Sequence, residues 1–176
     1  ATRLCALSEP GSCFSGGLFE LALAADRSYV LDMGDEPTMT LGPLNRADYP
    51  MSHGVSRLAA HYYGNLDRVE EVLSAGMLNA AEADDLGLVT VVLDDIDYEG
   101  DVRVAIEERA AMSPDALTGM EASLRFPGHE NADCKIFGRL SAWQNWIFIR
   151  PNAVGEQGAL QVYGKPERPQ FDYKRT

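Results

Sequence analysis

The sequence predicts an α/β fold with a helical extension at its C-terminal end. Apolar strand-like segments occur early in the chain, and segments with helical spacing of apolar residues dominate later. A glycine pair, Gly16-Gly17, separates the first strand-like segment from a helix rich in alanine and leucine. The chain has 176 residues, of which 45% are hydrophobic, so it is large enough to bury a core of its own.

Strands and one helix are expected around that glycine pair. An apolar strand over residues 3–14, punctuated by Pro10-Gly11, leads into it, and a helix over residues 17–25 follows. This helix is apolar on nearly all sides, which predicts a place in the core. The next expected elements are a strand over 28–31, an acidic loop over 32–37, a strand over 38–41 and an irregular loop with Pro43, Asn45, Asp48 and Pro50.

Helices dominate the remainder, and several have recognisable ends. Asn79 followed by Glu82 predicts a capping box, and Gly87 ends the same helix. Ser113-Pro114 opens another helix. The expected helices cover 55–63, 66–75, 79–86, 98–112, 113–125 and 132–148, with a strand over 88–93 and an irregular tail over 151–176.

The helix over 132–148 has the clearest periodicity. Ile136, Leu140, Trp143 and Ile147 fall on one face, with Phe137 beside them. Such a stripe is more typical of core packing or of a subunit contact than of a cofactor site. We therefore expect it to be buried, either in the core or in a homo-oligomer such as a dimer.

Charge and cysteine content exclude several kinds of partner. The net charge of −12 argues against nucleic acid and against an anionic membrane surface. Cys5, Cys13 and Cys134 lack the spacing of metal ligands, and we expect Cys5 and Cys13 to be buried free thiols. No metal site, membrane span or signal peptide is predicted, which favours a cytoplasmic protein.

The glycine pair and Glu20 are the main candidates for chemistry. The first N–H groups of a helix have no partner within the helix, and glycine lets a ligand approach the backbone closely. Glu20 follows one helical turn later. This arrangement suits stabilisation of an oxyanion by a backbone N–H, with an acid or base close by. A tight turn beside a solvated glutamate is the alternative that these residues leave open.

Three segments resemble, in the right order, the crotonase (enoyl-CoA hydratase/isomerase) superfamily. They are Gly16-Gly17-Leu18-Phe19-Glu20-Leu21-Ala22, Gly54-Val55-Ser56-Arg57-Leu58 and Ala80-Ala81-Glu82-Ala83-Asp84-Asp85-Leu86-Gly87-Leu88-Val89. The resemblance implies that residues 1–125 form the second half of a crotonase-like (ClpP/crotonase) fold, followed by a C-terminal helix and tail over 126–176. Because the chain begins with Ala1 in a strand-like segment, we expect a piece of a longer polypeptide.

Further segments resemble one family of ring-cleaving lyases within this superfamily. They cover residues 11–16, 20–29, 136–140, 142–148, 150–155 and 170–175. The resemblance implies hydrolytic carbon–carbon cleavage, in which an oxygenated, dearomatised benzoyl-CoA loses one ring carbon as formate. It also implies an acyl-CoA substrate, no cofactor and no metal. The alternatives are an enoyl-CoA hydratase or isomerase, and a non-catalytic dimerising half.

The resemblance assigns roles at the glycine turn. Gly17 matches the glycine whose N–H serves the oxyanion hole, so Gly16 and Gly17 are expected to hold the thioester. Glu20 matches the first catalytic glutamate of the hydratases. The family's second oxyanion donor comes from an earlier strand, which this sequence does not contain.

The second glutamate of the hydratases has no counterpart here. It would fall near residues 43–45, where there is no carboxylate. Plain two-carboxylate hydration is therefore disfavoured. Either this half performs different chemistry, with Asn45 or Asp48 as a polar partner, or it supports an active site elsewhere in the longer protein.

Overall fold

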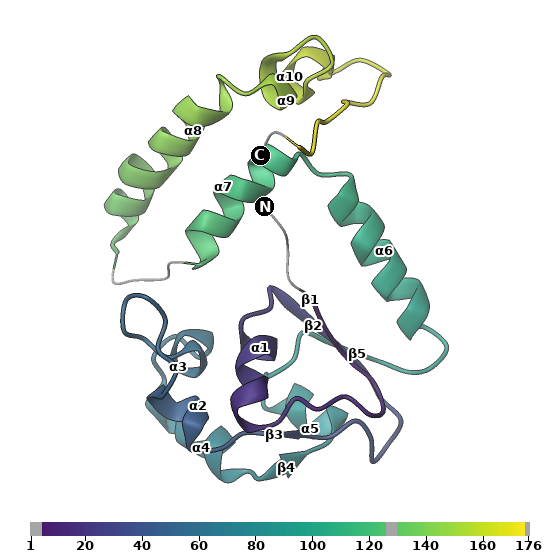
Figure 1. Cartoon of the computed structure of the whole chain (residues 1–176), viewed down its shortest axis with the longest axis vertical. Helices are drawn as coiled ribbons and strands as arrows, with labels where there is room; N and C mark the ends of the chain where they lie inside the picture. Colours follow the sequence, from purple (N-terminus) through teal and green to yellow (C-terminus); the bar gives the residue numbers. More distant parts are fainter. Residues whose placement is uncertain (1–4, 126–129, 175–176) are drawn as a thin grey trace. The chain divides into compact units, whose positions relative to one another are not determined.

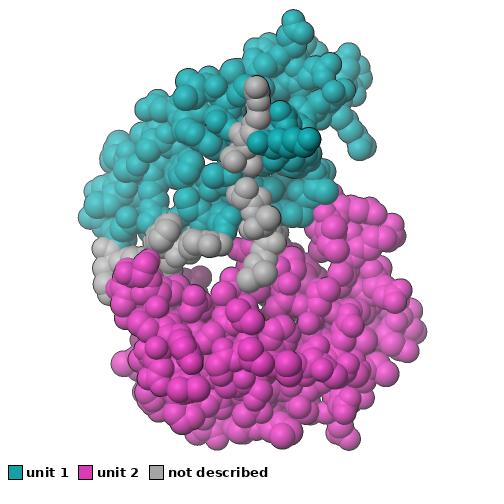
Figure 2. Space-filling model, in the orientation of Figure 1, with its two compact units in different colours: residues 1–3, 108–176 teal, residues 4–107 magenta. Residues whose placement is uncertain are grey.

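The computed structural model describes residues 5–125 and 130–174. The chain divides into two compact units, one of residues 4–107 and one of residues 108–176 together with residues 1–3 (Figure 2). This division falls inside a helix. The domain boundary expected between residues 125 and 126 is a different division, and it stays a prediction.

A three-stranded parallel sheet forms the centre of the first unit (Figure 1). Its strands lie in the order β1 (Cys5–Ser8), β2 (Arg27–Leu31) and β5 (Val91–Leu93). The parallel pair β1 and β2 needs a crossover, which contains the short helix α1 (Phe19–Leu23). A separate antiparallel pair consists of β3 (Met39–Thr40) and β4 (Met77–Leu78).

The first strand is shorter than the sequence predicted, because β1 ends at Ser8 rather than near residue 14. The Ser12 N–H donates to the Glu9 carbonyl oxygen at 2.8 Å, which closes a four-residue turn. Pro10 and Gly11 occupy its two central positions, and Gly11 has a φ of +88°. This combination is typical of a type II turn, so the turn chemistry overrides the strand preference of the residues that follow.

Further helices belong to this unit. They are α2 (Leu44–Ala47), α3 (Arg57–His61), α4 (Leu66–Ser74), α5 (Ala80–Asp85) and α6 (Tyr98–Ala110). The sequence predicted α4, α5 and α6 within two residues at each end and a longer α3, whereas α2 lies where an irregular loop was expected. The capping box at α5 is confirmed. Asn79 Oδ1 accepts from the Glu82 N–H, and Glu82 Oε2 accepts from the Asn79 N–H, both at 2.9 Å.

The hydrophobic core lies between the sheet and these helices. Its buried members are Phe19, Val30, Met39, Leu41, Leu58, Val69, Val72, Leu78, Ala80, Ala83 and Leu88. The expectation that a helix over residues 17–25 lies in the core is correct for only one of its faces. Phe19 is buried, but Leu21 is 59% exposed, because α1 has only five residues and covers the sheet with one face.

The second unit is helical. It contains α7 (Pro114–Arg125), the π-helix η2 (Cys134–Leu140), α8 (Ser141–Ile147), α9 (Pro151–Val154) and α10 (Ala159–Val162). Two short helices thus interrupt the tail that the sequence predicted to be irregular. The Arg150 Nε donates to the buried Asp115 carboxylate at 3.0 Å, and the Arg150 guanidinium lies over the Trp146 ring.

The apolar stripe of this unit is not buried along its whole length. Ile136, Phe137 and Leu140 are 46%, 72% and 64% exposed, which contradicts burial in the core of this chain. The stripe was derived from α-helical spacing, whereas residues 134–140 are wound as a π-helix with i to i+5 hydrogen bonds. Trp143 does pack within the unit, with its ring beside Gly119 of α7. A Cβ added at Gly119 would lie 3.4 Å from that ring.

The three cysteines are exposed free thiols, so the expectation that Cys5 and Cys13 are buried is wrong. Alternation along β1 buries Ala6 and Ser8 and turns Cys5 to the other face, while Cys13 lies in the loop after the turn. Among the described residues, no helix has the length and apolar character needed to span a membrane.

Candidate functional site

The glycine pair lies in a tight helical turn at the start of the crossover. Residues Gly16–Leu18 form a 3₁₀ turn (η1) that leads directly into α1. Gly16 has a φ of +52°, a conformation that glycine adopts without strain. Within the described part of the chain, no acceptor takes the Gly17 N–H. A Cβ added at Gly17 would lie 3.7 Å from the Tyr49 ring, so the aromatic side chain borders this turn.

Glu20 lies in the first turn of α1 and is only 8% exposed. Each of its carboxylate oxygens has a donor. The Asn45 amide nitrogen donates to Oε1 at 2.9 Å, and the Arg57 guanidinium donates to Oε2 at 3.2 Å. Two of the roughly four acceptor positions of the carboxylate are therefore occupied. Glu20 is a positioned carboxylate rather than a solvated surface glutamate.

Asn45 connects three segments of the chain and is fully buried. Its amide nitrogen donates to Glu20 and also to the Gly16 carbonyl oxygen, in both cases at 2.9 Å. Its amide oxygen accepts from the Gly42 N–H at 2.9 Å. The amide thus uses both of its protons and its oxygen, which satisfies the requirement for a buried polar group.

Arg57 reaches Glu20 from the first position of α3. The Ser56 hydroxyl caps this helix by accepting from the Ala59 N–H at 3.2 Å, which fixes where the helix begins. The same guanidinium nitrogen lies 3.4 Å from the Tyr49 carbonyl oxygen. Because the Arg57 side chain is 31% exposed, solvent screens its ion pair with Glu20 in part.

The structure brings most of the sequence-predicted site residues together. Gly16, Gly17, Glu20 and Asn45 form one connected group, and the expected polar partnership of Asn45 with Glu20 is seen directly. Asp48 does not join this group, because its side chain is exposed beyond the end of α2. The catalytic roles expected for these residues stay predictions.

Sequence reasoning missed two neighbours of the site. Arg57 belongs to the segment Gly54-Val55-Ser56-Arg57-Leu58, which carried the family resemblance but suggested no contact with Glu20. Tyr49 lies in a loop without a recognisable motif, and it reaches the site only because α2 and α3 bring that loop beside the glycine turn.

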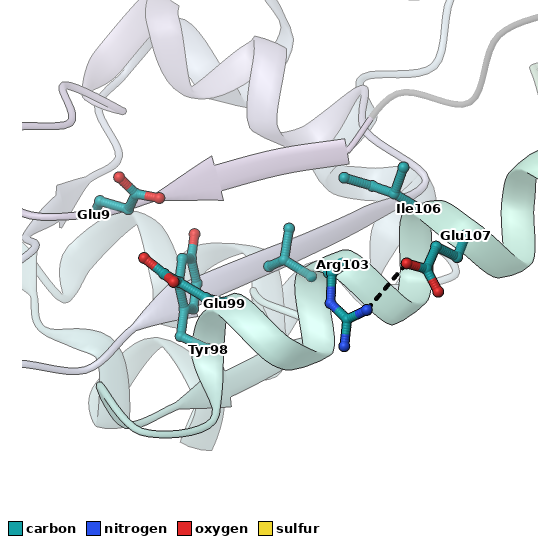
Figure 3. Close-up of a pocket in the computed structure, with 7 residues that line it drawn as sticks. Glu9, Tyr98, Glu99, Arg103, Ile106 and Glu107 are labelled. Carbon is teal, nitrogen blue, oxygen red and sulfur yellow. Dashed lines mark hydrogen bonds and ion pairs between the residues drawn. The ribbon is translucent and has the colours of Figure 1, made fainter.

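A separate open pocket of about 430 Å³ lies in the same unit (Figure 3). Its lining includes Glu9, Tyr98 and the ion pair of Arg103 with Glu107, and none of the candidate site residues. Burial, together with the charge of Glu9, raises the pKa of Tyr98 to about 12. Within the described residues, no cluster of three or more His, Cys, Asp or Glu side chains could hold a metal ion.

Comparison with solved structures defines the class of fold. An enoyl-CoA hydratase from Bacillus anthracis superposes with a TM-score of 0.65 and 21% identity, over 96% of this chain and 59% of that one. An enoyl-CoA hydratase/isomerase from Cupriavidus metallidurans gives 0.64 and 22% identity, over 99% and 63%. A putative enoyl-CoA hydratase from Thermobifida fusca, in complex with acetoacetyl-CoA, gives 0.59 and 21% identity, over 82% and 54%. The chain therefore has the crotonase fold that the sequence predicted.

One curated relative is much closer in sequence. The chain is 54% identical over 176 residues to benzoyl-CoA-dihydrodiol lyase from Aromatoleum evansii. The match covers 98% of this chain and 32% of that enzyme, so the chain spans about a third of its relative's length. The expected resemblance to part of this longer lyase is confirmed. No family model matches the chain.

Proposed function

We propose that the full-length protein cleaves the ring of a dihydrodiol or epoxide of benzoyl-CoA by hydrolysis and releases formate. The 54% identity to benzoyl-CoA-dihydrodiol lyase over nearly the whole chain is the observation that carries this proposal. The acyl-CoA substrate class is supported by the crotonase fold and by the solved relative in complex with acetoacetyl-CoA. The reaction is proposed to need neither a cofactor nor a metal, and to take place in the cytoplasm.

Within this protein, we propose that the glycine turn holds the thioester. The Gly17 N–H has no acceptor in the described part of the chain, so it is available to donate to the thioester carbonyl oxygen. A backbone donor at this position stabilises the negative charge that develops on that oxygen. Both oxygens of Glu20 already accept a hydrogen bond, so Glu20 suits holding a water molecule in place better than delivering a proton.

A second candidate function is that of a supporting half without catalysis of its own. The hydrogen bonds that Asn45 and Arg57 donate to Glu20 favour it, because they connect α1, α2 and α3 and so stabilise the fold. The range where the hydratases' second glutamate was expected, residues 43–45, also holds no carboxylate, and its Asn45 is buried. In this case the longer protein would place its chemistry outside residues 1–176.

Formate release from a dihydrodiol of benzoyl-CoA tests both candidates. In the full-length protein, Gly17→Pro removes the proposed donor, an N–H that has no acceptor within the described residues. We expect kcat to fall by about 10² to 10³, the effect of losing one oxyanion donor in other enzymes. Asp95→Asn, at an exposed carboxylate of the same unit, is the matched control. Wild-type turnover by the Gly17 variant would support the second candidate.

The isolated 176-residue chain is expected to release no formate, because the second oxyanion donor of the family lies outside it. Formate production by this chain alone would contradict that expectation. Such a result would show that the chain completes the site by itself.

We also propose that the protein is a homo-oligomer, such as a dimer. The side chains of Ile136, Phe137 and Leu140 support this because they are exposed, and an exposed apolar patch on a protein surface often marks a contact with another subunit.

A further inference from the structure

The peptide unit between Gly16 and Gly17 is held from its carbonyl side. The Asn45 amide nitrogen donates to the Gly16 carbonyl oxygen at 2.9 Å. The only cis peptide bond in the described residues is Glu36–Pro37, so this unit is trans. In a trans unit the C=O and the following N–H lie in one plane and point in opposite directions. The bond from Asn45 therefore helps to set the direction of the Gly17 N–H.

The 3₁₀ turn supplies one further hydrogen bond to this peptide unit, because the Phe19 N–H also donates to the Gly16 carbonyl oxygen, but the two residues themselves restrict the unit little. Glycine on both sides leaves the unit free to rotate, because neither residue has a Cβ that restricts φ and ψ. Gly16 also has a φ of +52°. A hydrogen bond to the carbonyl further polarises the amide, which makes its N–H a better donor.

The orientation of the Asn45 amide is itself determined by its neighbours. Glu20 takes the second proton of the amide nitrogen, and the Gly42 N–H donates to the amide oxygen. If the amide were rotated by 180°, its oxygen would face the Gly16 and Glu20 oxygens, which are both acceptors. Its nitrogen would then face the Gly42 N–H, which is a donor. Glu20 and Gly42 thus aim the Asn45 donor at Gly16.

We propose that Asn45 is a positioning residue for the oxyanion donor: it orients the Gly16–Gly17 peptide unit so that the Gly17 N–H meets the thioester carbonyl oxygen. The inference rests on the proposed function of Gly17. It assigns to Asn45 a role in setting the direction of a backbone dipole, without contact between Asn45 and the substrate.

Infrared difference spectroscopy of bound benzoyl-CoA, labelled with ¹³C at the thioester carbonyl, tests this role in the full-length protein. A hydrogen bond to the carbonyl oxygen lowers its stretching frequency. Asn45→Asp keeps the shape of the side chain but removes the donor to Gly16. Asn45→Asp combined with Glu20→Gln restores a hydrogen bond between positions 45 and 20 with the donor reversed, and still leaves the Gly16 oxygen without its side-chain donor. Glu20→Gln alone, which retains the Asn45 donor, is the matched control.

We expect the thioester carbonyl frequency to be lowered in the wild type and in Glu20→Gln. In Gly17→Pro and in both variants that carry Asn45→Asp, we expect the frequency not to be lowered. In formate release, both variants with Asn45→Asp should lower kcat by about tenfold or more, with KM changed less than about threefold. Rescue of the lowered frequency by the double variant would contradict the inference.

The possible failures are distinguishable. If Gly17→Pro loses the lowered frequency and the variants with Asn45→Asp keep it, the positioning role is rejected and the proposed function stands. If Gly17→Pro keeps it, or the wild type lacks it, the proposed function of the turn is rejected. If neither variant with Asn45→Asp folds, as judged by thermal unfolding, Asn45 is a folding residue and the inference is also rejected.

Discussion

The Glu20 carboxylate draws its contacts from segments that are distant in the sequence. Asn45 approaches it from α2 and Arg57 from α3, while Glu20 itself lies in α1. A carboxylate that is 8% exposed loses much of its hydration, and these donors replace it. The stability of this part of the fold should therefore depend on both partners.

Arg57→Met should lower the free energy of unfolding by roughly 1–3 kcal/mol, because it leaves Oε2 of a buried carboxylate without its donor. Partial exposure of the Arg57 side chain places the expected loss toward the lower end of that range. Urea unfolding at pH 7 measures it, with Arg57→Lys as the variant that keeps the charge and should lose less. Equal stability of Arg57→Met and the wild type would show that the ion pair contributes nothing.

Tyr62 gives the protein a predictable response to alkali. Its hydroxyl donates to the Leu86 carbonyl oxygen at 2.8 Å, and burial raises its pKa from 10.0 to about 12. The unfolded chain therefore releases this proton at lower pH than the folded chain does. The stabilising contribution of Tyr62 is complete below pH 10 and is lost as pH rises through about 12.

Tyr62→Phe should accordingly show a smaller loss of stability than the wild type between about pH 10 and pH 12. Denaturant midpoints at several pH values in this range provide the measurement. Tyr98, whose pKa is raised to a similar value, contributes its own loss, so the slope should be reduced rather than abolished. An unchanged slope would mean that Tyr62 titrates alike in the folded and unfolded chains.

At the site, the sequence predicted the residues better than it predicted their geometry. Gly17 and Glu20 could be found because a glycine turn and a carboxylate one turn later form a local pattern. Asn45 could be named only as the residue near a missing glutamate. Its bonds to Gly16 and Glu20 depend on how a distant loop folds back, and no local pattern encodes that approach.

Among the secondary-structure elements, α5 shows how a short helix can be specified locally. Its capping box satisfies the backbone N–H groups of both Asn79 and Glu82. We expect Asn79→Ala to destabilise the protein by about 1 kcal/mol, since the cap is lost while the helix interior is untouched. Thermal unfolding tests this, with Asp84→Ala on the exposed face of the same helix as control. Equal melting temperatures for Asn79→Ala and the control would contradict a stabilising cap.

Element boundaries were predictable where the signal is a cap or a turn. Asn65, Asn79 and Ser56 each begin a helix within two residues of the predicted position. Two boundaries that failed were drawn from apolar patterning. The strand expected to reach residue 14 is ended by the turn at Pro10-Gly11, and the stripe over 132–148 spans a change from π- to α-helical winding.

At the scale of the whole molecule, the apolar face of η2 should decide the oligomeric state. Leu140→Glu places a charge on a side chain that is 64% exposed in this chain, so the fold itself should tolerate it. In the full-length protein we expect the variant to lower the molecular mass measured by light scattering. Glu121→Gln, which changes a charge on α7 of the same unit, is the control. An unchanged mass for Leu140→Glu would remove the role of this face in self-association.

The edge-to-face pair of Trp143 and Trp146, with ring centroids 5.1 Å apart, has a practical consequence for spectroscopy. These are the two tryptophans of the sequence, and both belong to the unit of residues 108–176. Tryptophan emission from this chain therefore reports on that unit alone, and the unit that carries Glu20 and Asn45 gives no such signal. Melting curves recorded by fluorescence and by far-ultraviolet circular dichroism should coincide only if the two units unfold together, so their separation measures the cooperativity between them.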